Sequence, residues 1–424
     1  FKIVHTLNYI FAQESAFGFR LASILIHILN IFIFYLILLK LNFFKYQALI
    51  WAIFYGVLPI NVSAVVLISA RADILAAFFI LLSFLSYLNF IERKKTFYFL
   101  VPILFYIFAI LSKESALPFF LLVIIYSIAS GNFKKQVLYY AVVPLAYFFL
   151  RASILGRVGT GVPFLRGDGC VAILSSLAAF FKYISKFFIP INLSLSDAFL
   201  KYRTFFNFEV ISGAALFLGI CYYLAVCFKK KNIVLTFALS WLILFYIPIS
   251  NIIPALHFWA ERFFYLPGFG LAVFIGYFTM RGNTLNRIIP VFVAFYVIVN
   301  MNYQSYFKNN EVLFKRALAI SDFSQEAYTM LGYHYLLDGN YPFSIYYYHL
   351  ATQSHENYYG FSSMVESYNN LGVLFLRLNQ TQEARKWLDM LVKSGKANGA
   401  VFCNLEIIKS LDNGDKKYIE EIKE

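Results

Sequence analysis

The stretch Asn251–Gly268, NIIPALHFWAERFFYLPG, lies between two apolar runs that are each long enough to enter a bilayer. It contains an adjacent acid and base, Glu261 and Arg262, followed by two aromatic residues and then by Tyr265 and Pro267. Charged side chains near hydrocarbon are costly and are usually paired or functional. We therefore expect this stretch to be a functional loop at a membrane surface.

The composition around this loop is that of a membrane protein. The chain has 424 residues, of which 61% are hydrophobic and 14% charged, whereas soluble domains are nearer half apolar and a quarter charged. Apolar runs fall near 19–39, 46–60, 74–91, 97–112, 116–130, 137–150, 208–228, 233–250, 266–281 and 287–301. These runs predict an all-α chain whose first part is a polytopic bundle of transmembrane helices.

The charges predict an orientation for this bundle. The net charge of +14 would favour a nucleic-acid partner in a soluble protein, but much of the excess lies in short connections between apolar runs, so we expect none. The basic connections, expected to be cytoplasmic, hold Lys40, Lys45, Arg93–Lys95, Lys134, Lys135, Lys229–Lys231, Arg281 and Arg287. The alternate connections hold Asp73, Glu114, Asp168, Asp197, Glu209 and Glu261. Ten crossings would place both ends of this chain outside, with 171–190 as a re-entrant or surface-lying helix or a pair of short passes.

The composition becomes polar from about Asn309, and two later segments resemble each other. Ala327–Ala351 and Tyr368–Leu391 align with Gly332 opposite Gly372, Ser344 opposite Ala384 and Tyr348 opposite Leu388. Small residues at the first two of these aligned positions, with a bulky residue at the third, allow the two helices of a hairpin to touch, as in the tetratricopeptide repeat. The 40-residue spacing of the two glycines predicts an insertion near Ser354–Tyr359. Ala317 indicates a preceding half-repeat, and Phe402–Ser410 a degenerate last one. We predict a soluble α-solenoid over 303–424, after a membrane domain over 1–302.

Three acid–base neighbours are expected on the outer side of the membrane domain: Arg71 with Asp73, Lys113 with Glu114, and Glu261 with Arg262. Any one of them is explained by an ion pair at a helix end whose side chains extend to the interface. Three together favour a site for the phosphate of a membrane lipid, because Arg forms bidentate hydrogen bonds with phosphate and Lys provides a point charge.

Other polar residues give weaker indications. The Gly-rich segment 156–169, with Arg157, Arg166 and Asp168, matches no phosphate-loop pattern and is interpreted as a flexible outer loop. His27 is interpreted as a helix-packing polar group. A role for His257 is suggested only by the proximity of His257 to Glu261 in the sequence. The four cysteines show no spacing typical of a disulfide framework or a zinc site.

The order of short motifs resembles one family. The motifs are ISARAD, LSKESALP, YISKFFIPINLSLSDAF, PISNIIPALHFWAERFFYLP and KNNEVLFKRAL, followed by the repeats. In this order they resemble the transmembrane and TPR-containing O-mannosyltransferases and their bacterial relatives, over almost the whole chain. The chain departs from the family pattern at two places. Ala70 replaces the usual glycine of the motif at Ala70–Asp73, and Leu58–Ser63 lacks the His and the acid that the family often has there.

The resemblance implies a GT-C glycosyltransferase that moves a sugar from a polyprenyl- or dolichyl-phosphate donor to a protein hydroxyl. It implies that the catalytic acid lies in a first outer loop upstream of Phe1, so that this chain is a truncated form whose catalytic residue is unknown. We expect Arg262 to bind the donor phosphate, supported by Lys113 and Arg71. Orienting or secondary roles are expected for Glu261, Asp73, Glu114, Asn251 and Tyr265.

The sequence indicates no metal site or cofactor, and a requirement for a divalent metal stays open. The expected partners are membrane lipid, the polyprenyl-phosphate sugar and a protein acceptor bound in the repeat groove. We expect a bacterial inner membrane with periplasmic repeats, the alternative being the endoplasmic reticulum with luminal repeats. Two other functions stay open: a surface-glycan ligase or polymerase that uses lipid-linked sugars, and a non-enzymatic membrane scaffold.

Overall fold

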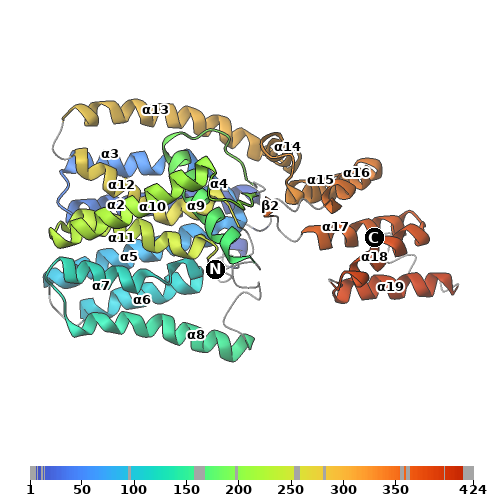
Figure 1. Ribbon diagram of the computed structural model, residues 1–424, viewed down its shortest axis with the longest axis horizontal. Coiled ribbons are helices and arrows are strands. Elements are labelled where there is room, and N and C mark those ends of the chain that lie inside the picture. Colours follow the sequence, from blue (N-terminus) through green and yellow to red (C-terminus); the bar gives the residue numbers. More distant parts are fainter. Residues whose placement is uncertain are drawn as a thin grey trace. The chain divides into compact units, whose positions relative to one another are not determined.

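The computed structural model describes residues 6, 8–10, 13, 15–93, 97–156, 168–195, 199–252, 258–279, 283–353, 358–359, 363–395 and 397–413 (Figure 1). The secondary structure of these residues is helical apart from one two-stranded sheet, which confirms the all-α class. The chain forms two compact units. The first comprises Phe1–Leu193 and Tyr202–Ser305, and the second comprises Ser194–Lys201 and Tyr306–Glu424.

The first unit has a helix at each of the predicted apolar ranges. The helices are α2 (Ala16–Lys40), α3 (Lys45–Gly56), α5 (Arg71–Arg93), α6 (Phe97–Ser112), α7 (Phe119–Ala129), α8 (Val142–Leu155), α10 (Phe208–Lys229), α11 (Ile233–Tyr246), α12 (Tyr265–Thr279) and α13 (Asn283–Ser305). Together with α4 (Val62–Val66) and α9 (Gly169–Phe188), they form a bundle (Figure 1).

Among the described residues, six helical stretches are long and apolar enough to cross a membrane. They are Ala16–Lys40, Ile68–Arg93, Lys135–Leu155, Gly169–Phe188, Phe208–Lys229 and Ile288–Lys308. A crossing needs about 20 residues, and α7 and α11 have 11 and 14. The membrane-protein class is therefore supported, whereas ten separate full crossings do not follow from helix length.

The predicted run 46–60 is broken in two. Helix α3 ends at Gly56, and the chain bends by 52° into the short helical stretch Pro59–Val66. The break precedes Pro59, whose ring disfavours a helical conformation in the residue before it. Leu58 accordingly has an extended backbone, with ψ of 122°.

Helix α9 settles the form of the 171–190 region. It is one uninterrupted helix of 20 residues, so the alternative of two short passes is wrong. It packs along the connection between α11 and α12: Tyr246 donates a hydrogen bond to Ser176 O at 2.5 Å, and Tyr183 donates one to Ala260 O at 3.1 Å. This connection is the stretch that carries Glu261 and Arg262.

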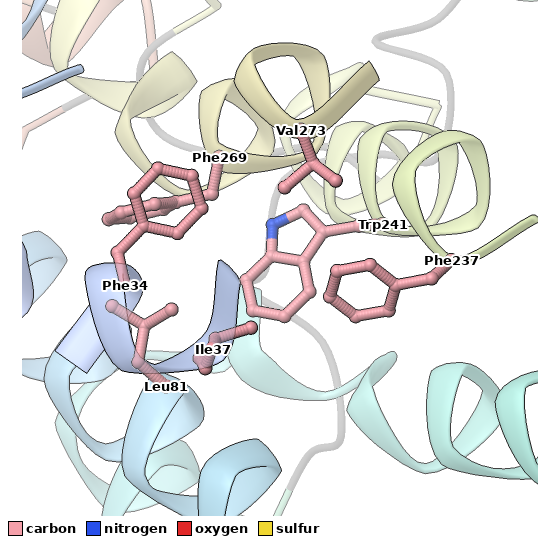
Figure 2. Close-up of a pocket in the computed structure, with 7 residues that line it drawn as sticks. All are labelled: Phe34, Ile37, Leu81, Phe237, Trp241, Phe269 and Val273. Carbon is pink, nitrogen blue, oxygen red and sulfur yellow. The ribbon is translucent and has the colours of Figure 1, made fainter. Parts of the chain in front are cut away.

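The centre of the first unit is an apolar junction of α2, α5, α11 and α12. Figure 2 shows the aromatic ring of Trp241 facing the side chains around a narrow gap. The lining side chains are those of Phe34, Ile37, Leu81, Phe237, Trp241, Phe269 and Val273. The indole nitrogen of Trp241 donates to Leu266 O at 2.7 Å. The gap has no polar lining and no room for a water molecule, so it is a packing contact and not a ligand site.

The second unit contains helical hairpins. Its helices are α14 (Asn310–Ile320), α15 (Gln325–Leu337), α16 (Tyr341–Thr352), α17 (Ser363–Arg377), α18 (Thr381–Lys393) and α19 (Gly399–Asp412). The hairpins α15–α16 and α17–α18 turn through left-handed residues at equivalent places, Gly339 with φ of 72° and Asn379 with φ of 59°.

The predicted equivalence of the two hairpins has a structural counterpart. A Cβ added to Gly332 would lie 2.7 Å from the Tyr348 ring, and one added to Gly372 would lie 2.7 Å from Leu388. Ser344 is buried and donates a hydrogen bond to Gly332 O at 2.8 Å. Each glycine therefore lets the two helices of its own hairpin approach closely, as the alignment predicted.

The second unit also takes in a segment from between α9 and α10. Strand β1 (Phe199–Leu200) pairs antiparallel with β2 (Tyr358–Tyr359). Leu195 packs against the core cluster formed by Phe314, Ala317, Ala327 and Leu331. Strand β2 falls in the predicted insertion Ser354–Tyr359, the rest of which lies outside the described residues. The sequence did not predict this contribution to the second unit.

The close helix contact in the second unit can be tested with Gly372→Leu. We expect a loss of about 3 kcal/mol in local stability, because extra methylenes in a packed core force side chains and backbone apart. Hydrogen exchange of the α17 and α18 amides, measured by mass spectrometry on the whole protein, should become faster. The control is Gly399→Leu, since no atom lies within 4 Å of a Cβ added at Gly399. Equal exchange in both variants would contradict the contact.

Candidate functional site

Charged side chains from four parts of the first unit meet where α5 and α12 begin and α6 ends. They are Asp73 on α5, Lys113 after α6, Lys186 on α9, and Glu261 and Arg262 on the single turn η7 (Glu261–Phe264) before α12. We call these five residues the ionic cluster. The sequence predicted that charges from separate loops would lie on one side of the membrane domain, and these five residues do lie together at one end of the bundle.

Lys113 pairs with Asp73, which is 40 residues earlier in the sequence. The pairing follows from the close packing of α5 against α6. The Lys113 ammonium also lies 4.6 Å from the centre of the Phe263 ring. Burial lowers the pKa of Lys113; the Asp73 carboxylate raises it, and the positive charge of Arg262 lowers it further. Lys113 is thus paired with Asp73, and the positive charge of Arg262 opposes its own.

Glu261 is buried, with only 1% of its surface exposed, and both of its carboxylate oxygens accept hydrogen bonds. Lys186 Nζ donates to Oε1 at 2.8 Å, and the Tyr303 hydroxyl donates to Oε2 at 3.1 Å. Lys186 Nζ also donates to Asn192 O at 2.8 Å. These contacts connect η7 to α9 and α13, and they compensate a carboxylate that would be costly to bury alone.

Arg262 differs from the other charges of the ionic cluster. Its side chain is partly buried, and its guanidinium lies 5.1 Å from the centre of the Phe263 ring, the same ring that Lys113 contacts. Among the residues that the structure describes, no carboxylate forms an ion pair with it. A cation that shares an aromatic ring with another cation, in partly apolar surroundings, favours an anion as its partner.

The charges of the ionic cluster do not cancel. Lys113 is matched by Asp73 and Lys186 by Glu261, which leaves the positive charge of Arg262 in excess. Because Arg presents several N–H donors in a planar fork, this excess charge suits the oxygens of a phosphate or carboxylate. The arrangement can bind an anion at the end of the bundle.

The ion pairs are not formed between the sequence neighbours from which the site was predicted. Arg71 is buried and faces α2: it donates to Phe19 O at 2.5 Å and to Ser23 Oγ at 3.2 Å, and its guanidinium lies 5.2 Å from the Phe19 ring centre. Glu114 instead pairs with Arg151 on α8, and Tyr147 donates to it at 3.0 Å. Arg71 thus contacts α2, and Glu114 contacts α8.

Two further predicted residues have positions outside the ionic cluster. Asn251 is buried in a left-handed conformation, with φ of 58°, and its amide donates to Phe258 O at 2.6 Å. Tyr265 turns its hydroxyl toward α2, where it contacts His27 Nδ1 at 2.7 Å and Asn30 Nδ2 at 3.0 Å. His27 also contacts Gly56 O at 3.0 Å, which fits the predicted helix-packing role.

Of the remaining residues predicted in the outer loops, Glu209 lies in the first turn of α10, and Asp168 directly precedes α9. The Asp168 carboxylate caps α9 by accepting hydrogen bonds from Cys170 N at 3.1 Å and Val171 N at 3.2 Å. Arg157, Arg166 and His257 lie outside the described residues. Within the described part of the chain, no three His, Cys, Asp or Glu residues are grouped as a metal site would require.

Sequence reasoning missed Lys186, Tyr303 and Arg151. A signal existed for Lys186 and Arg151, because each is a cation at or near the end of an apolar helix, where a charge is costly without a partner. Tyr303 offered none, since the chain has 32 tyrosines and the sequence does not distinguish the one that reaches Glu261.

Comparisons of this chain with protein-family models, curated proteins and solved structures found no match.

The environment of Lys113 predicts two opposite pKa changes. Asp73→Asn should lower the Lys113 pKa further, because the carboxylate that stabilises the ammonium is removed. Arg262→Met should raise it, because a neighbouring positive charge is lost. The Lys113 signal can be followed by NMR of reductively ¹³C-methylated protein against pH and assigned with Lys113→Met. Shifts in the same direction in both variants would contradict the arrangement described.

Proposed function

We propose that this protein is a membrane glycosyltransferase that uses a polyprenyl- or dolichyl-phosphate sugar, with Arg262 as the main ligand of the donor phosphate. The observation that carries the proposal is the guanidinium of Arg262, which contacts the same Phe263 ring as Lys113 and has no ion-pair partner among the described residues. The order of the six sequence motifs, from ISARAD to the repeats, supports the same class of enzyme.

The proposed chemistry needs positive charge at the leaving group. The acceptor hydroxyl oxygen attacks the anomeric carbon of the sugar while a base takes the hydroxyl proton. The bond between the anomeric carbon and the phosphate oxygen breaks, and its electron pair stays with the lipid phosphate. Fixed cations near that oxygen stabilise the charge that develops in the transition state. Arg262 would take this role, with Lys113 as a second positive charge.

The other charged residues then have supporting roles. Asp73 holds Lys113, and Glu261 fixes the turn that carries Arg262. Arg71, which bonds to the start of α2, would support the site by fixing α2 against α5 and not by touching phosphate. Asn251 would hold the connection before η7, and Tyr265 the start of α12. Glu114 would fix α8 through Arg151. The base that accepts the hydroxyl proton is not assigned.

The second unit is proposed to be a tetratricopeptide-type solenoid that binds the protein acceptor. Its hairpins α15–α16 and α17–α18 share the glycine contacts and left-handed turn residues described above. Stacked helical hairpins of this type present a concave surface to an extended peptide. The acidic connections and the ionic cluster would face the periplasm, or the lumen of the endoplasmic reticulum, because the basic connections favour the cytoplasmic side.

Binding of the donor phosphate can be tested with farnesyl phosphate and the purified protein in lipid nanodiscs. Arg262→Met should weaken binding by about tenfold to a hundredfold, because a hydrogen bond to a charged group contributes roughly 1.5–3 kcal/mol. Isothermal titration calorimetry measures the change. The matched control is Lys40→Met, a cation that pairs with Glu92 at 2.5 Å at the other end of α5, and farnesol controls for the apolar tail. If wild type and Arg262→Met bind equally, Arg262 does not bind the phosphate.

The reaction itself can be tested with radiolabelled polyprenyl-phosphate sugars and a periplasmic or luminal extract. Transfer of label to protein that is lost in Arg262→Ala, while the variant still folds, supports the proposal. Label in lipid-linked glycan indicates a surface-glycan ligase or polymerase instead. Without transfer to either product, binding of protein partners by the intact protein would favour a membrane scaffold.

A further inference from the structure

Glu261 poses an electrostatic problem for the proposed anion site. It is a buried carboxylate directly before Arg262 in the turn η7, so its negative charge lies near any phosphate that Arg262 binds. In surroundings of low polarity such a charge repels an anion more strongly than it would in water. An anion site beside Glu261 therefore requires that its charge be balanced.

The contacts of Glu261 meet this requirement. Lys186 supplies the balancing charge at 2.8 Å from Oε1, and its own ammonium is held by a second acceptor, Asn192 O, at 2.8 Å. Tyr303 occupies the other oxygen, Oε2, at 3.1 Å. Because Lys186 lies on α9 and Tyr303 on α13, the carboxylate is held from two sides.

The same contacts restrict the turn that carries Arg262. Tyr183 on α9 donates to Ala260 O at 3.1 Å, just before η7. The Tyr183 ring stacks on Trp259 and Phe264, with ring centres 4.0 Å and 5.1 Å apart. With Glu261 fixed as well, η7 is held at its start by side chains of other helices. The Arg262 backbone is thereby fixed before any ligand binds, which lowers the cost of ordering the site.

We infer that Lys186 and Tyr303 are positioning residues of the anion site. They neutralise and hold Glu261, so that the positive charge of Arg262 is available to a phosphate group of a lipid. Lys186 acts through Glu261 and does not itself contact the phosphate. This inference rests on the proposed function of Arg262.

The inference predicts that the affinity for farnesyl phosphate depends on whether the charge of Glu261 is balanced. In Lys186→Met the carboxylate is unbalanced, and farnesyl phosphate should bind about tenfold more weakly, a change of about 1.4 kcal/mol. Glu261→Gln removes the negative charge while keeping an acceptor for Tyr303, and it should bind as tightly as wild type or more tightly. The double variant Lys186→Met/Glu261→Gln should recover wild-type affinity to within about twofold.

Two further variants separate positioning from folding. Lys186→Arg keeps the balancing charge and should bind like wild type. Tyr303→Phe loses one hydrogen bond to Glu261 and should weaken binding by a few fold, about the effect of a single hydrogen bond. Lys40→Met again serves as the control for loss of a paired lysine.

A readout without a lipid ligand distinguishes failure of the inference from failure of the proposed function. The rate at which phenylglyoxal modifies Arg262, followed by mass spectrometry, reports the charge around the guanidinium. The rate should fall in Lys186→Met, rise in Glu261→Gln and return to the wild-type value in the double variant.

The outcomes are distinct. The phenylglyoxal rates can follow this order while farnesyl phosphate does not bind the wild-type protein. Lys186 then balances the charge of Glu261, but the site does not bind a lipid phosphate, and the inference as stated is overturned. If the double variant binds as weakly as Lys186→Met, Lys186 contacts the phosphate directly or is needed for folding, and the inference is overturned. Wild-type binding by Lys186→Met also overturns it.

Discussion

The position of the ionic cluster depends on the hydrogen bonds around Tyr265. The Nε2 of His27 contacts Gly56 O, which can only accept, so Nε2 carries the proton and Nδ1 accepts from the Tyr265 hydroxyl. Asn30 donates to the same hydroxyl, and Tyr55 donates to Tyr265 O. Such bonds are strong in apolar surroundings, where water does not compete. They fix the start of α12 against α2 and α3, and η7 immediately precedes it.

The sequence predicted the helices of the first unit because hydrophobicity and length are local properties of the chain. The form of the 46–60 run was missed, although Pro59 is the physical reason for its break. The glycine contacts of the second unit were also predictable, because Gly332 and Gly372 occupy equivalent places in two similar segments. Helix position and type were thus accessible from residues that are neighbours in the sequence.

The partners within the candidate site were not accessible in this way. Asp73, Lys113, Glu261 and Arg262 were predicted as charges of one surface, and the structure brings these four together. Adjacent residues suggested the pairs Lys113–Glu114 and Glu261–Arg262, whereas the observed pairs are Lys113–Asp73 and Glu261–Lys186. Each observed pair joins different helices, and which helices pack together depends on the whole bundle. The site therefore forms only once α5, α6, α9 and α12 have assembled.

The segment Ser194–Lys201 gives the two units an interleaved connectivity. The chain leaves the first unit after Leu193, contributes strand β1 to the second, returns at Tyr202 and leaves again after Ser305. Neither unit is therefore one continuous piece of the polypeptide. A fragment that begins at Tyr306 would lack the strand partner of β2 and the apolar contact of Leu195. During synthesis, strand β1 cannot form this pairing until Tyr358 and Tyr359 have emerged, roughly 160 residues after Leu200.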